Sequence, residues 1–449
     1  MIHLRMLLHA IAWIIFFFEG VIDALALPGT LMSWIAMGSI LGLVIIMGLH
    51  GRFHLPLIFP VLGLVGLAFY SGRYTGEYSW LLILAFLRQL ILLPYLYFLV
   101  LVNERSDRVV RWVTRLVVSL VLLQIPAFLI KLAVLGGPEI EDYVGTVSML
   151  NGSMAVLITM IPMVFAFSWY LASKNKAYLA LSLLFVLLSQ INGKRTTLLL
   201  APILMVMLAT MSLRSRRASL VPLVRGLLAV SLVVAFLGYA VVRINPWLNP
   251  DGRVGGRFDP SFVIEFVVDY NFGMGASDIA SLSRFRALPY VLQLQTGQGW
   301  TRLLSGGGAG SLSVANRQVP EGVDPVTHFT GVRYGARGGA IWIFLQVGIL
   351  GLVLIFTIGF ALFREFGQRK DIPWHMIAGK GILAVVAFDV LIYSTVTLQY
   401  FSISGMVLSY AALFYRDRLR QRDVLASWAP ARSRQPRVEF LPAVPTPLL

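Results

Sequence analysis

The sequence contains no cysteine, and only 13% of its 449 residues are charged. Without cysteine the chain has no disulfide framework, no thiolate nucleophile and no cysteine-ligated metal. Soluble domains usually carry about 25% charged residues. This composition therefore excludes a large soluble enzyme and a disordered scaffold. With 58% hydrophobic residues and a mean hydropathy of +0.79, the chain is predicted to be an integral membrane protein.

Apolar runs recur along the chain at the length of about 20 residues that a membrane-spanning helix needs. They lie at 6–27, 29–49, 54–71, 79–102, 110–134, 149–172, 177–191, 196–213, 221–242, 339–363, 375–397 and 401–415. These runs predict an all-α polytopic membrane protein with about twelve transmembrane helices. Transmembrane helices 1–9 are expected within 1–242, a loop subdomain at 243–338, helices 10–12 at 339–415, and a basic, disordered tail at 416–449.

Basic residues are concentrated in alternate connections between these runs, for example at Arg52, Lys174 and Arg214. Because cytoplasmic loops carry an excess of Lys and Arg, both termini are predicted to be cytoplasmic and segment 243–338 to lie outside. The net charge of +16 is attributed mainly to this topology. We therefore expect the lipid bilayer, and no nucleic acid, as a partner.

The predicted outer segment 243–338 is rich in arginine and has no lysine. Its arginines are Arg243, Arg253, Arg257, Arg284, Arg286, Arg302, Arg317, Arg333 and Arg337. Arginine is suited to bidentate recognition of phosphate, so an anionic ligand is one interpretation and a solvated loop surface is the other.

Two patterns stand out within this segment. Apolar residues at Leu282, Phe285, Leu288, Val291 and Leu292 recur at helical spacing and predict an amphipathic helix over 281–297 at the membrane surface. Arg284 and Arg286 lie on its first turns. A glycine-rich run at 305–311 is either a flexible turn or a nest of backbone N–H groups that binds an anion.

The remaining candidate residues are scattered along the sequence. Lys194 and Arg195 lie in a polar turn at the predicted outer boundary of the membrane. They either form a site for an anion or are flanking side chains that extend to the membrane–water interface. His328 is the only histidine of the outer segment and so the candidate general base, unless it is merely solvent-exposed. Arg88 lies inside the fourth run, either paired with Asp389 or available to a diphosphate.

No metal-binding or nucleotide-binding motif is present. The outer acidic residues show neither a DxD pair nor calcium-loop spacing, and the chain has no Walker A loop. We therefore expect neither a metal nor another cofactor.

Four stretches resemble, in order, motifs of the superfamily of O-antigen ligases and Wzy-type polysaccharide polymerases. They are Gly145–Gly152, similar to G-T-f-x-n-x-N; Gly193–Thr196, similar to S-R-T/S-x-L; Arg284 with Gly306–Gly310, similar to R…W…G-x-G-x; and Gln346–Gly351, similar to E-x-G-x-x-G. The family often has His-Asn where this chain has Arg337-Gly338, and Glu where it has Gln346. This departure favours a divergent polymerase over a standard ligase.

The resemblance implies a GT-C-like fold and a metal-independent glycosyl transfer at the periplasmic face of a bacterial inner membrane. The donor would be a polyprenyl-diphosphate-linked oligosaccharide, with a chain-length regulator and export machinery as further partners. Arg284 and His328 are the candidate catalytic residues; Arg195, Arg88, Arg286, Arg337 and Lys194 are the candidates for holding the diphosphate. The alternatives are a ligase that transfers the glycan to lipid A-core, and a transporter of lipid-linked glycan.

Overall fold

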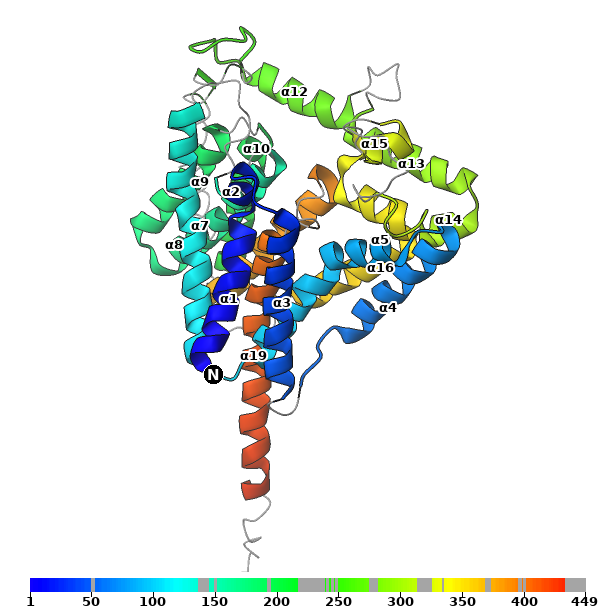
Figure 1. Ribbon diagram of the computed structural model, residues 1–449. Coiled ribbons are helices and arrows are strands. Elements are labelled where there is room, and N and C mark those ends of the chain that lie inside the picture. The colour runs from blue at the N-terminus through cyan, green and yellow to red at the C-terminus, as the bar shows by residue number, and fades with distance from the viewer. Residues whose placement is uncertain are drawn as a thin grey trace, which may run out of the picture.

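The chain was analysed as a computed structural model that describes residues 1–49, 53–135, 145–148, 152–191, 195–216, 239, 242–243, 246, 249–273, 282–312, 325–332, 335–367, 373–394, 398 and 401–432. Every regular element of the described residues is helical (Figure 1). This confirms the all-α prediction. Five helices are long and apolar enough to cross a membrane, at 29–48, 80–103, 107–134, 154–173 and 339–366.

The helices before the long polar segment follow the predicted runs. They are α1 (Ile2–Phe17), α2 (Glu19–Ala24), α3 (Gly29–Gly48), α4 (Ile58–Tyr70), η1 (Ser71–Thr75), α5 (Trp80–Leu87), η2 (Arg88–Leu92), α6 (Leu93–Asn103), α7 (Asp107–Leu135), α8 (Gly152–Ser173), α9 (Lys176–Ile191) and α10 (Arg195–Arg216). Most of the ninth predicted run, at 221–242, lies outside the described residues.

The second half of the described chain begins with short helices and ends with long ones. They are α12 (Pro260–Phe272), α13 (Arg284–Gly297), α14 (Trp300–Ser305), α15 (Pro325–Thr330), η5 (Gly335–Arg337), α16 (Gly339–Gly367), α17 (Pro373–Phe388), η6 (Asp389–Tyr393) and α19 (Phe401–Arg432). Asp259 caps the N-terminus of helix α12: its carboxylate accepts hydrogen bonds from the backbone N–H groups of Ser261 and Phe262.

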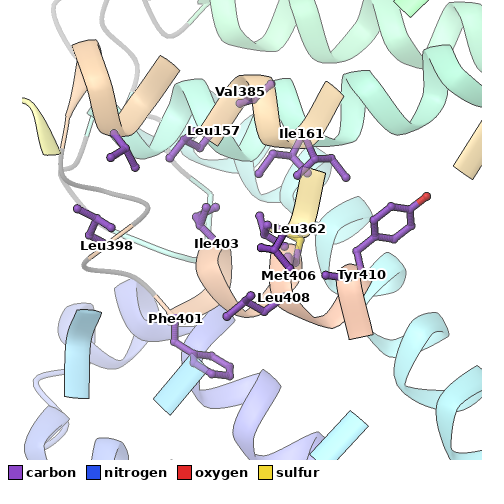
Figure 2. Packing of buried hydrophobic residues seen from close by; sticks show 14 of the residues in the cluster. Leu157, Ile161, Leu362, Val385, Leu398, Phe401, Ile403, Met406, Leu408 and Tyr410 are labelled. Carbon is purple, nitrogen blue, oxygen red and sulfur yellow. The ribbon is translucent and has the colours of Figure 1, made fainter. Parts of the chain in front are cut away.

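The core is built around α8. In the most apolar 18-residue stretch of α8, 83% of the residues are buried, whereas the corresponding share for α7 is 22%. Helix α8 is therefore central and α7 is peripheral. Figure 2 shows how α19 closes this core: Ile403 and Met406 of α19 lie toward Leu157 and Ile161 of α8. Helix α17 also packs closely on α8 and α10. Gly381 of α17 permits this approach, because a Cβ there would lie 2.7 Å from side-chain atoms of both helices.

The two ends of the molecule differ in character. Helices α12, α13 and α15 lie at one end, which we call the loop end; the N-terminus and the last turns of α19 lie at the opposite, terminal end (Figure 1). Trp, Tyr and Phe side chains cluster near α14 and η1, where Tyr74 and Trp300 are largely exposed. Exposed aromatic residues are typical of a membrane–water interface.

The prediction of a disordered tail from residue 416 is wrong as far as Arg432, because α19 continues to that residue. Three of its basic side chains, those of Arg416, Arg418 and Arg420, pair with acidic residues of other helices. Arg416, itself 5% exposed, pairs with Asp107 and donates to the Glu104 carbonyl oxygen, and Arg418 pairs with Glu365 at 2.9 Å. These partners lie far away in sequence, so composition alone could not identify them.

Candidate functional site

The stretch 145–148, from the first motif, is a packing element at the C-terminal end of α1. The Thr146 hydroxyl donates to the Phe17 carbonyl oxygen at 2.8 Å, and its backbone N–H donates to Gln124 Oε1 at 2.9 Å. The backbone N–H of Gly20 donates to the carbonyl oxygen of Thr146 at 3.1 Å. A threonine is needed here because its hydroxyl joins two helices through one buried contact.

The glycine-rich run does not form an open anion-binding nest, nor a flexible turn. Its backbone N–H groups are used within the protein: Gly307 donates to the Leu345 carbonyl oxygen at 2.7 Å, and Gly310 donates to Gln346 Oε1 at 2.9 Å. A Cβ on Gly306 would lie 2.4 Å from the Gln346 carbonyl carbon. The glycines are therefore present so that this loop can lie directly on α16.

Helix α16 is kinked where it meets this loop. Gly348 has φ 65° and ψ −165°, a conformation that is essentially restricted to glycine. A Cβ there would lie 2.3 Å from the Leu304 carbonyl oxygen. The third and fourth resemblance motifs are thus two halves of one interlocked structure, with Gln346 as a buried hydrogen-bonding side chain.

The predicted amphipathic helix is present as α13, and the face that packs against the protein shares Val291 with the predicted apolar stripe. Ala287, Val291 and Gln295 are buried, whereas Phe285 and Leu288 of the predicted apolar stripe are about 40% exposed. Phe285 stacks on Phe272 of α12 with ring centroids 4.3 Å apart. The stripe is predicted to lie at a membrane surface, so the exposure of Phe285 and Leu288 is compatible with that prediction.

Three of the predicted site regions come together at the loop end. Helix α13, which carries Arg284 and Arg286, packs against η5, which carries Arg337, and η5 also packs against α15, which carries His328. Arg284 and Arg286 are partly buried, whereas Arg337 and His328 are exposed. Guanidinium groups and an imidazole on adjoining elements could bind an anionic group and accept a proton.

Arg88 and Asp389, the possible ion pair within the predicted spans, do not pair with each other in the described residues. Arg88 and Asp389 each begin a π-helical turn, η2 and η6, and the described contacts include no ion pair between them. Arg88 lies instead within electrostatic range of Glu19 of α2. The Asp389 carboxylate accepts a hydrogen bond from the Ser394 hydroxyl. π-Helical turns often occur at functional sites. Arg88, with Glu19 nearby, is therefore kept as a candidate for binding the diphosphate.

The polar turn at 193–196 is described only in part. Arg195 begins α10, but its side chain and Lys194 lie outside the described residues. The turn is bracketed by a buried hydrogen bond in which Gln190 of α9 donates to the Thr197 hydroxyl of α10. Helix α10 in turn contacts α12, which leads toward α13.

A cavity of about 320 Å³ that no sequence pattern predicts lies beneath α13 and α14. Its polar and aromatic lining includes Thr75, Tyr78, Gln295, Gln298, Arg302 and Phe329. These residues come from three separate parts of the chain, and Gly307 and Ser311 of the glycine-rich run also line the cavity. Only Phe329 neighbours a predicted site residue, since it follows His328. We call this cavity the outer pocket.

The described residues contain no group of three His, Asp or Glu side chains placed to hold a metal ion. The arrangement of the loop end is therefore one of arginines, a histidine and a polar pocket on packed helices. No model of a known protein family matches the sequence, and no curated protein is similar to it.

Proposed function

We propose that this chain is a membrane polysaccharide polymerase. It joins oligosaccharide repeats carried on a polyprenyl diphosphate, at the periplasmic face of a bacterial inner membrane, to make an exopolysaccharide, capsule or O-antigen. The transfer needs no metal. All twelve apolar runs cross the membrane in this proposal, and segment 243–338 lies outside.

The observation that carries the proposal is the packing of α13, η5 and α15 at the loop end. It gathers elements that bear Arg284, Arg286, Arg337 and His328, which lie up to about 50 residues apart in sequence. The interlocked Gly306–Gly310 and Gln346–Gly351 stretches support the proposal as well. Both belong to motifs of the family resemblance, and they pack against each other.

The reaction breaks the bond between the anomeric carbon of the donor sugar and its phosphate oxygen, and forms a glycosidic bond to an acceptor hydroxyl. The bonding electrons leave with the polyprenyl diphosphate, whose concentrated negative charge must be stabilised. In this proposal Arg284 is the principal cation, aided by Arg286 and Arg337 and by Arg195, Lys194 or Arg88. His328 accepts the proton that the acceptor hydroxyl loses.

The test is the product made by the purified, full-length protein from a polyprenyl-diphosphate oligosaccharide, with and without lipid A-core. A regular ladder in the absence of lipid A-core supports the polymerase. Product that requires lipid A-core identifies a ligase instead. No product in either case, together with movement of the donor across proteoliposome membranes, identifies a transporter and overturns the proposal.

A further inference from the structure

We infer that the outer pocket binds a sugar unit of the glycan. This inference rests on the proposed function, because it assigns part of the substrate to a position beside the proposed reaction site. The pocket lies under α13 and α14, and Phe329 in its wall is the neighbour of His328.

The size of the pocket suits a small organic group. Its volume of about 320 Å³ lies at the lower end of the range of about 300–1,000 Å³ that is usual for small-molecule sites. Gln295 is eleven residues after Arg284 on α13, which corresponds to about 16 Å along the helix. A glycan that extends from a diphosphate held near Arg284 could therefore reach the pocket.

The wall of the pocket contains a buried acceptor that a donor on a ligand could satisfy. Gln295 is only 5% exposed, and its Oε1 atom has no hydrogen-bond partner among the residues that the structure describes. An unsatisfied buried carbonyl oxygen is costly. A phosphate is fully ionised or nearly so and offers few donors, whereas each hydroxyl of a sugar can donate.

The other side chains supply complementary donors and apolar faces. Arg302 donates to Gln298 Oε1 at 2.6 Å, which holds its guanidinium at the wall. Burial raises the pKa of the Tyr78 phenol, an effect that Arg302 opposes, so the hydroxyl stays protonated and able to donate. The rings of Tyr78 and Phe329 offer apolar surface to the C–H face of a sugar.

The lining is unsuitable for the alternatives. A lipid chain would offer no hydrogen-bond donor to Gln295 Oε1 and would place hydrocarbon against the polar Gln298 and Arg302 side chains. An anion would meet a single arginine that is already hydrogen-bonded, together with the lone pairs of Gln295 Oε1. A neutral or weakly charged sugar satisfies both donors and acceptors.

The test measures binding of the free oligosaccharide repeat, prepared without lipid or diphosphate by hydrolysing the surface glycan of the source cell. We expect Gln295→Leu to weaken binding by the full-length protein at least about tenfold. Tyr78→Phe, which keeps the ring, should weaken it less. The matched control is Gln293→Leu on the same helix, where the side chain is exposed and does not line the pocket.

The outcomes separate this inference from the proposed function. Binding that Gln295→Leu and Tyr78→Phe both leave unchanged overturns the sugar pocket, even if the protein forms a polymer ladder. Displacement of the repeat by inorganic pyrophosphate also overturns it, because the pocket would then be an anion site. Binding lost in Gln295→Leu but kept in Gln293→Leu supports the pocket, even if no ladder forms and the polymerase proposal fails.

Discussion

At the scale of single residues, the proposed reaction uses the guanidinium groups of the loop end for their geometry as well as for their charge. Arg284 is partly buried at the start of α13, beside the buried Ser283 and Ala287. A guanidinium can bind two oxygens of one phosphate through parallel hydrogen bonds, whereas an ammonium group acts as a point charge. Its replacement therefore separates a recognition role from a merely electrostatic one.

Arg284→Lys is expected to lower the rate of polymer formation about ten- to a hundredfold, because the charge remains but the bidentate contact is lost. The rate is measured from the ladder made by purified protein. Arg253→Lys is the control, since Arg253 is an exposed arginine in the same outer segment. A near-normal rate for Arg284→Lys would remove Arg284 from the diphosphate site.

His328→Ala is expected to lower the rate by about 10²–10⁴ if the imidazole accepts the acceptor proton. The shape of the pH–rate profile should then change as well. His54→Ala is the control, because His54 is exposed elsewhere on the molecule. If the His328→Ala profile keeps its shape, the proton acceptor is another group.

At the scale of elements, the contact between the glycine-rich loop and α16 determines the form of the loop end. Backbone meets backbone there: Gly306 and Gly348 approach so closely that neither has room for a side chain. The Gln346 amide, which is 1% exposed, then fixes Gly310. Any shift of this contact would move α14 and the outer pocket with it.

Gly348→Ala is expected to destabilise the protein by about 1–3 kcal/mol, because alanine is strained at φ 65° and its Cβ would meet the Leu304 carbonyl oxygen. The measurement is thermal unfolding in detergent. Gly359→Ala, in the same helix with nothing within 4 Å of the added Cβ, should be neutral or slightly stabilising. Equal effects of the two substitutions would mean that the kink is not needed.

At the scale of the whole molecule, the terminal end is held together by ion pairs and the loop end by backbone packing. Arg416, Arg418 and Arg420 of α19 pair with carboxylates of α7 and α16, and Arg5 of α1 pairs with Glu104 at 3.1 Å. If the basic end is cytoplasmic, the arginine-rich loop end faces outward.

This orientation is testable because the natural chain has no cysteine to give a background. Thr301→Cys lies on an exposed position of α14, and Ala177→Cys lies on the exposed start of α9. In intact spheroplasts, a membrane-impermeant maleimide is expected to label Thr301→Cys at once and Ala177→Cys only after permeabilisation. The reverse pattern would contradict an outward-facing loop end.

The sequence predicted the helices well because hydrocarbon permits few backbone arrangements other than helices. Apolar runs such as 29–49 and 79–102 therefore coincide closely with α3 and with α5–η2–α6. The continuation of α19, the burial of the glycine-rich loop and the outer pocket could not be predicted. Each depends on partners distant in sequence, such as Asp107 for Arg416 and Gln346 for Gly310.

The central claim is that chain growth and departure of the lipid diphosphate are one reaction. The most direct test counts both products made by the purified protein in the presence of a chelator. For the proposed polymerase reaction, we expect one polyprenyl diphosphate to be released for each new glycosidic bond in the ladder. Diphosphate released without a ladder, or a ladder that forms only after Mg²⁺ is restored, would contradict it.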